Sequence, residues 1–149
     1  MTMDRRSVLR ALSGAVVAGI ALPRMAWAAW SESAMKASES TAAMAELFGS
    51  ADNQASAEVK LKAPEIAENG AVVPLEVSTS LPVEQIAIFI DNNPSPLAMT
   101  ATLGAGTAGL VKTRVRMGET SNVVAVVKSG GKLYSASQEV KVTIGGCGG

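Results

Sequence analysis

An alternation of apolar and polar side chains with a period of two, beginning at Glu58, constrains the fold of this chain more than any other feature. In the first such stretch, Val59 and Leu61 alternate with two lysines. Successive side chains of a strand point to opposite faces, so this pattern is typical of a strand with one buried face. Similar short segments follow along the chain. The seven candidate strands cover residues 58–63, 71–78, 84–90, 97–103, 110–117, 123–127 and 133–144.

Turn-forming residues separate these candidate strands at intervals of about ten residues. The stretch 91–96 reads DNNPSP, the stretch 104–109 is rich in glycine, and two adjacent glycines at 130–131 indicate a tight hairpin. Many short strands with this spacing favour a mainly β fold, an immunoglobulin-like antiparallel β-sandwich of about seven strands. The paired cysteines and the tryptophan of antibody domains are absent.

Two candidate strands carry a further indication of their place in a sheet. Pro74 has no backbone N–H to donate, so it limits the segment 71–78 to a sheet edge or a bulge. The segment 84–90 is apolar on both faces, and we therefore expect it to be a central strand.

Ahead of the strands, the period of the apolar residues is 3.6, which predicts a short amphipathic helix over residues 31–48. Ser31 or Ser33 could cap its N-terminus, and Gly49 is placed to end it. The following residues, 49–57, are interpreted as a loop. The expected apolar face of the helix consists of Ala34, Ala37, Thr41, Met44 and Phe48.

The first 28 residues resemble an export signal that is removed from the mature protein. Three arginines precede an apolar run over residues 11–23, and an Ala-Trp-Ala cleavage sequence follows at 26–28. The run is shorter than the roughly 20 residues that span a bilayer, so we expect no permanent membrane anchor. The pair Arg5-Arg6 favours the twin-arginine route and a periplasmic location, and an ordinary secretory signal is the alternative.

Charge and residue content exclude several classes of function. Without the leader, 9 basic and 12 acidic residues remain, a net charge of −3 that predicts no nucleic-acid partner. The chain has no histidine and one cysteine, so the usual zinc, copper and haem sites lack ligands and no His-dependent nucleophile can form. The basic residues Lys112, Arg114 and Arg116 form either a solvent-exposed strand face or an anion-guiding surface. Glu65 and Glu68 are interpreted as solvated.

The single cysteine, Cys147, lies near the end of the sequence between glycines. One cysteine cannot form an internal disulfide, so it is either free or bonded to another molecule. Glycines allow many backbone conformations, and we expect a flexible arm that holds the cysteine about 10 Å beyond Ile144. The arm consists of Gly145, Gly146, Cys147, Gly148 and Gly149.

This Gly-Gly-Cys-Gly-Gly arm resembles that of the SoxY family of sulfur carriers, and the segment PEIAENGAVVPLEV at 64–77 is also similar to that family. The resemblance implies a carrier without cofactor or metal, not an enzyme, that holds thiosulfate-derived sulfur covalently on Cys147. It implies a heterodimer with a SoxZ-like subunit. It also implies partner enzymes, namely the c-type haem protein SoxAX, the manganese hydrolase SoxB and the sulfane dehydrogenase SoxCD. The arm offers no cation that would stabilise a thiolate, so we expect a partner to activate the thiol.

Two other interpretations remain. Ubiquitin-like sulfur carriers also end in Gly-Gly, but their ATP-dependent activation does not suit an exported sandwich. An exported immunoglobulin-like binding or adhesion module could carry an incidental or dimer-forming tail cysteine. The predicted organisation is a leader at 1–28, a helical segment at 29–49, a β-sandwich at 50–144 and the carrier arm at 145–149.

Overall fold

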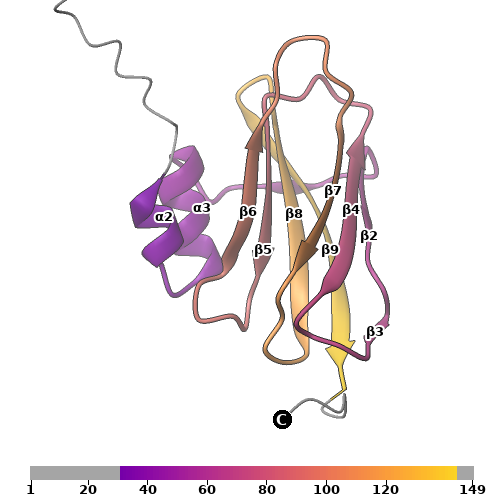
Figure 1. Ribbon diagram of the computed structural model, residues 1–149. Coiled ribbons are helices and arrows are strands. Elements are labelled where there is room, and N and C mark those ends of the chain that lie inside the picture. Colours follow the sequence, from indigo (N-terminus) through magenta and orange to yellow (C-terminus); the bar gives the residue numbers. More distant parts are fainter. Residues whose placement is uncertain (1–30, 144–149) are drawn as a thin grey trace, which may run out of the picture. The chain divides into compact units, whose positions relative to one another are not determined.

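The computed structural model describes residues 31–143, which form two short helices and a β-sandwich (Figure 1). The predicted mainly β, immunoglobulin-like fold is confirmed. Each of the seven candidate strands is present, with ends that differ by a few residues, and two additional strands of two residues each occur. The elements are α2 (Glu32–Lys36), α3 (Ser40–Phe48), β1 (Gln54–Ala55), β2 (Val59–Lys62), β3 (Ile66–Ala67), β4 (Val73–Thr79), β5 (Gln85–Ile90), β6 (Leu97–Thr102), β7 (Leu110–Val115), β8 (Ser121–Ser129) and β9 (Lys132–Val142).

The strands form two sheets that pack face to face. The larger sheet has the order β1-β9-β8-β5-β6, with β3 also paired to β9, and the smaller sheet has the order β2-β4-β7. The long strands pair antiparallel, whereas β1 and β3 each pair parallel with β9. The core between the sheets is built from the inward-facing side chains of both, and the largest completely buried ones are aliphatic.

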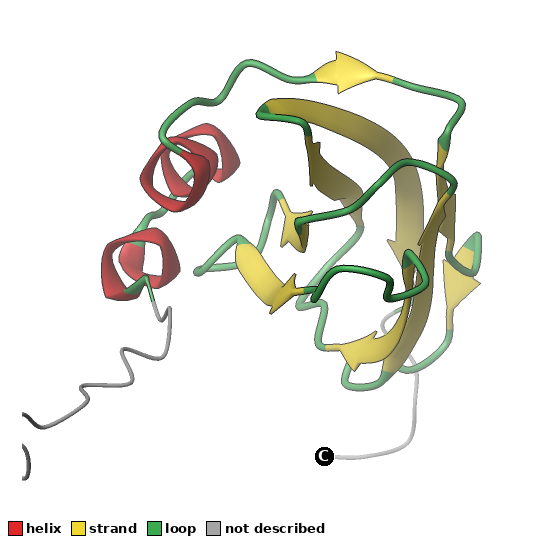
Figure 2. Ribbon diagram, turned by 90° about the horizontal axis from the view of Figure 1, so that it is seen from above, coloured by secondary structure: helices red, strands yellow, loops and turns green. Residues whose placement is uncertain are grey.

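The two helices cover the outer face of the larger sheet, as the view from above shows (Figure 2). Met44 of α3 and Phe89 of β5 are buried in this second apolar layer. Strand β5 therefore faces the sandwich core on one side and the helices on the other. This explains why residues 86–90 are all buried and why the segment is apolar on both faces. Its predicted central position is confirmed, because β5 lies between β8 and β6.

The prediction of one continuous helix over 31–48 is wrong, because the chain is extended at Ala37 and Glu39. Ala34 and Ala43 are both completely buried against the sheet. Nine residues of a straight helix turn through about 900°, which would place these two alanines on opposite faces. The break turns both toward the sheet. The predicted ends of the helical segment hold, since the Ser31 side chain accepts a hydrogen bond from the Ala34 N–H, and Gly49 is left-handed with φ 81°.

Three other local predictions can be compared with the structure. Thr41 is exposed instead of lying on the buried face, and the expected loop at 49–57 contains β1. The hairpin at 130–131 is confirmed, with φ of 56° and 75° at the two glycines. Pro74 lies in the middle strand of the smaller sheet, but β2 pairs with β4 only from Glu76 to Thr79. Pro74 thus occupies a stretch of β4 that has a neighbour on one side only, which is a local edge.

Candidate functional site

The predicted attachment residue Cys147 and its four glycine neighbours lie outside the described residues, as does the predicted leader. The predicted boundaries at 28/29 and 144/145 also fall there. The structure does describe the strand that leads to the arm. Strand β9 lies between β8 and the short strands β1 and β3 in the larger sheet, and it ends at Val142, one residue before the last described residue, Thr143.

Hydrogen bonds hold the end of β9 on both of its sides. On one side, the Lys141 and Thr143 N–H groups donate to the carbonyl oxygens of Glu65 and Ala67, at 3.0 and 3.1 Å. On the other side, the Val142 N–H donates to the Thr120 hydroxyl at 3.0 Å. The chain is therefore fixed as far as Thr143.

The segment 64–72, which holds β3, packs beside the end of β9 (Figure 1). Its turn is closed by the Ala71 N–H, which donates to the Asn69 side-chain oxygen at 2.9 Å. Gly70 lies close to the segment that follows β7, since its carbonyl oxygen accepts a hydrogen bond from the Met117 N–H at 2.7 Å. A Cβ at Gly70 would lie 2.9 Å from a methyl carbon of Val142. This turn thus directly supports the end of β9 at residues 141–143, which is called the arm base because the predicted arm follows it.

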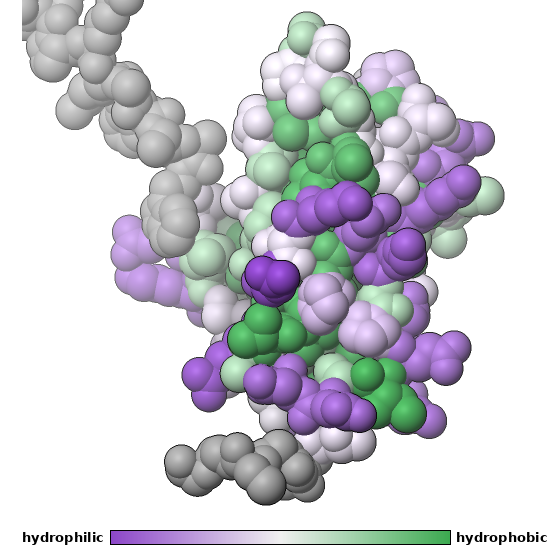
Figure 3. Space-filling model, turned by 45° about the vertical axis from the view of Figure 1, so that its right-hand side comes forward, coloured by the Kyte–Doolittle hydropathy of each residue, from purple (hydrophilic) through white to green (hydrophobic). Residues whose placement is uncertain are grey.

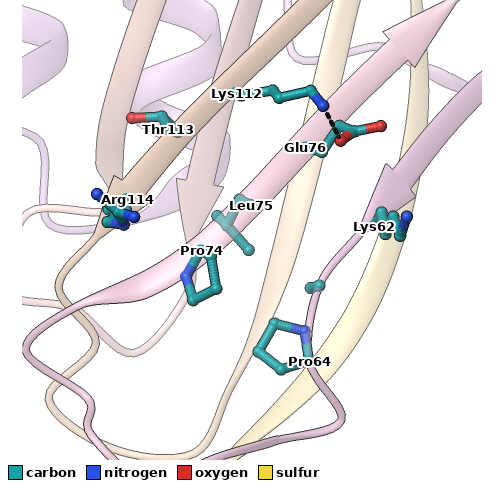
Figure 4. A pocket seen from close by; sticks show the side chains of 9 residues that line it. Lys62, Pro64, Pro74, Leu75, Glu76, Lys112, Thr113 and Arg114 are labelled. Atoms are coloured by element: carbon teal, nitrogen blue, oxygen red, sulfur yellow. Dashed lines mark ion pairs between the residues drawn. The ribbon is translucent and has the colours of Figure 1, made fainter.

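A groove lies on the outer face of the smaller sheet, where β2 leaves β4 after Lys62 (Figure 4). Its volume is about 780 Å³. Pro64, on the segment that follows β2, and Pro74, on β4, lie on its two sides, and Leu75 contributes to its floor. Three of its lining residues are cationic, namely Lys62, Lys112 and Arg114. They are paired directly with residues of β4 and therefore share the outer face of the sheet with them. The complete lining is Lys62, Ala63, Pro64, Pro74, Leu75, Glu76, Lys112, Thr113 and Arg114.

Glu76 and Lys112 pair across β4 and β7, with 2.9 Å between the carboxylate oxygen and the ammonium nitrogen. The hydrogen bond from Lys112 lowers the pKa of the Glu76 carboxyl. The alternation predicted for this strand is confirmed, since Val115 and Met117 are buried while Lys112, Arg114 and Arg116 are exposed. The solvent-exposed strand face is confirmed, and the anion-guiding surface stays the untested alternative.

Glu65 and Glu68 are exposed, as predicted. Within residues 31–143, no three His, Cys, Asp or Glu side chains lie close enough together to hold a metal ion. None of the helices in this range has the length and apolar content needed to cross a membrane.

Comparison with known proteins identifies the family. The family model described as "Sulfur oxidation protein SoxY" matches residues 44–147, from the middle of α3 to the cysteine. The chain belongs to the SoxY family. The solved structure of the sulfur carrier protein SoxY from Chlorobium limicola f thiosulfatophilum is 48% identical in sequence. The match covers 68% of this chain and 94% of the Chlorobium chain, with a TM-score of 0.63.

A superoxide reductase (neelaredoxin) from Ignicoccus hospitalis is also similar in structure, with a TM-score of 0.52 at 16% identity. This match covers 58% of this SoxY-family chain and 83% of the reductase, and it shows a shared fold only. No curated protein sequence matches the chain significantly.

Sequence reasoning missed the way in which segment 64–72 supports the arm base. It missed β3, the close approach of Gly70, and the exposure of Ile66 and Val72. The only sequence signal was the resemblance of residues 64–77 to the family, which marked the segment without indicating its neighbours. The groove was not predicted either, because it depends on where β2 separates from β4.

Proposed function

We propose that this SoxY-family protein carries thiosulfate-derived sulfur covalently on Cys147 and presents it to partner enzymes during oxidation of thiosulfate to sulfate. The observation that carries the proposal is the extent of the family match, which reaches residue 147 and so includes the only cysteine of the chain. A carrier needs one attachment atom on an accessible arm, and the sequence has one thiol between pairs of glycines. The protein is then a substrate of the pathway enzymes and not itself a catalyst.

The chemistry requires three kinds of partner. Oxidative joining of the Cys147 thiolate to thiosulfate forms an S–S bond and releases two electrons, which a c-type haem enzyme such as SoxAX accepts. Hydrolysis of the resulting S-thiosulfonate by a manganese enzyme such as SoxB adds water, releases sulfate and leaves a persulfide. A sulfane dehydrogenase such as SoxCD oxidises the remaining sulfur and removes its electrons. Every step acts on atoms bound to one side chain.

A second subunit completes the proposed carrier. We expect a SoxZ-like protein to form a heterodimer with this chain. Thiolate formation at Cys147 is assigned to the partner's active site, because a thiolate needs a nearby cation, base or helix N-terminus and the glycine arm provides none.

The proposed location is the periplasm, and the leader at 1–28 supports it. Replacing Arg5 and Arg6 with lysines tests the twin-arginine route, because the positive charge is kept while the arginine pair is lost. We expect the uncleaved precursor to accumulate in the cytoplasm. Normal export and cleavage of this variant would indicate an ordinary secretory signal.

Intact-mass spectrometry tests the carrier function most directly. The heterodimer is incubated with thiosulfate and the c-type haem enzyme, and the mass is recorded before and after treatment with a reductant. We expect one thiosulfate adduct that the reductant removes, and no adduct on Cys147→Ala. An unmodified wild-type chain in a system that conjugates a known SoxY would contradict the proposal, and would favour an immunoglobulin-like binding module.

A further inference from the structure

Exposed hydrophobic side chains are concentrated next to the arm base. Among residues 31–143, three large hydrophobic side chains are more than a third exposed, namely Ile66 at 57%, Val72 at 50% and Leu110 at 46%. Two of the three lie in the segment 64–72, whose backbone is hydrogen-bonded to the end of β9. Single exposed hydrophobic residues are ordinary, but two within seven residues at this place need an explanation.

These two side chains are held outward by a fixed backbone. Their neighbours Ala67 and Val73 are buried in the core, at 5% and 0% exposure. The turn between them is closed by the hydrogen bonds of Asn69 and Gly70 described above. Ile66 and Val72 therefore cannot turn inward without breaking these contacts. A side chain held ready in this way contacts a partner at a lower entropic cost than a mobile one.

The length of the arm determines what can reach this surface. Cys147 lies four residues beyond Thr143, the last position held by the sheet. A fully extended chain of four residues spans at most about 14 Å. An enzyme that encloses the Cys147 sulfur in an active site below its own surface must therefore bring the rim of that site close to the residues around Thr143.

We propose that the arm-base surface, defined by Ile66 and Val72, is the docking contact for the rim of each enzyme that modifies Cys147. This inference rests on the proposed function, since it requires Cys147 to enter another protein. The matching rim would present apolar side chains. The charges around the surface are of both signs, from Glu65, Glu68 and Lys141. In the view of Figure 3, hydrophobic and hydrophilic side chains lie side by side in the lower part of the described molecule.

A small apolar contact fits a carrier that serves several enzymes in turn. Strong binding to one enzyme would delay transfer to the next, and a few exposed aliphatic groups provide limited affinity without demanding one set of polar partners. The contact would lower the KM for the carrier and leave the chemistry at the sulfur unchanged.

The test uses the complete carrier heterodimer and the c-type haem enzyme that joins thiosulfate to it. The double variant Ile66→Thr/Val72→Thr keeps β-branched side chains at both positions and makes them more polar. Leu110→Thr is the matched control, because Leu110 is similarly exposed but lies at the opposite end of β7 from Val115, the partner of Val73. We expect kcat/KM for the double variant to fall about tenfold with little change in kcat, and the control to match the wild type.

Two further measurements separate the possible outcomes. Tetrathionate, a small reagent that needs no docking, adds thiosulfate to a thiolate and releases thiosulfate, and it should modify all three proteins at one rate. Equal kcat/KM for the double variant and the control would overturn the docking proposal and leave the carrier proposal intact. Loss of the heterodimer in the double variant would also overturn it, because the surface would then belong to the subunit interface. A wild-type chain that neither tetrathionate nor the enzyme modifies would refute both proposals.

Discussion

Replacing Gly70 with alanine should destabilise the sandwich, because the turn it occupies has no room for a side chain. An added Cβ would clash with the Met117 carbonyl oxygen and would lie 2.9 Å from a methyl carbon of Val142. The nearer atom belongs to the backbone, so a side-chain rotation cannot relieve the contact. The two backbone segments at Gly70 and Met117 must move apart. This weakens the hydrogen bond from the Met117 N–H to the Gly70 carbonyl, which is 2.7 Å long in the wild type.

The expected size of the effect follows from two contributions. Overpacking in a fixed environment costs about 1–3 kcal/mol. Loss of one backbone hydrogen bond adds about 0.5–1.5 kcal/mol. The free energy of unfolding should therefore fall by about 2–4 kcal/mol. For a domain of this size the melting temperature should fall by about 10 °C or more.

Thermal unfolding followed by circular dichroism measures the effect, with Gly118→Ala as the control. Gly118 lies one residue beyond Met117, and a Cβ there would meet nothing within 4 Å. We expect that alanine to be neutral or slightly stabilising, because it reduces the conformational entropy of the unfolded chain. Equal melting temperatures for the two variants would refute the argument that the turn is packed against the arm base.

Three other predictions concern the surface and the arm. Lys112→Met should raise the pKa of the Glu76 carboxyl in an NMR titration, because Lys112 lowers that pKa in the folded state. The stability that the Glu76–Lys112 pair contributes is therefore present above the pKa of Glu76 in the unfolded chain, and it is lost as the pH falls through the pKa of Glu76 in the folded protein. Without its partners, the protein should form dimers linked through Cys147 on non-reducing gels, and a chain that stays monomeric under oxidation would contradict this. Gly146→Val and Gly148→Val should leave melting and modification by a small thiol reagent unchanged but slow enzymatic conjugation, whereas conjugation at the wild-type rate would show that the arm enters no narrow channel.

The sandwich could be predicted from the sequence because its signal is local. Most long strands alternate within themselves, β5 is marked instead by its continuous apolar run, and several strands pair with the next one in sequence, as in the β8–β9 hairpin. The break between α2 and α3 has a different origin. It satisfies the burial of Ala34 and Ala43 against a sheet formed by residues much later in the chain, so no window of sequence around Ala37 contains its cause.

The support of the arm base could not be predicted for the same reason. Strand β3 has two residues, too few to show an alternation, and its partner in β9 is 75 residues away. The hydroxyl of Thr120 and the carbonyl of Ala67 are common groups that acquire a role only when the fold places them beside Val142 and Thr143. Cys147, in contrast, was predicted from the sequence by its glycine neighbours and by the resemblance of the tail to the SoxY family, and its role stays a prediction because it lies outside the described residues.

The shared fold of SoxY and the superoxide reductase shows why the sandwich alone does not determine function. At 16% identity the two chains have the same general architecture, yet this chain has no histidine and cannot build a histidine-ligated metal site. Its described part also lacks a cluster of metal-binding side chains. What this sandwich contributes is a fixed starting point, because β9 is bonded on both sides up to Thr143. In the proposed carrier, the chemistry depends on the few residues that follow Thr143 and on the proposed docking surface beside them. Substitutions in the core should therefore act through stability, whereas those at Ile66, Val72 and the arm should act through transfer of sulfur.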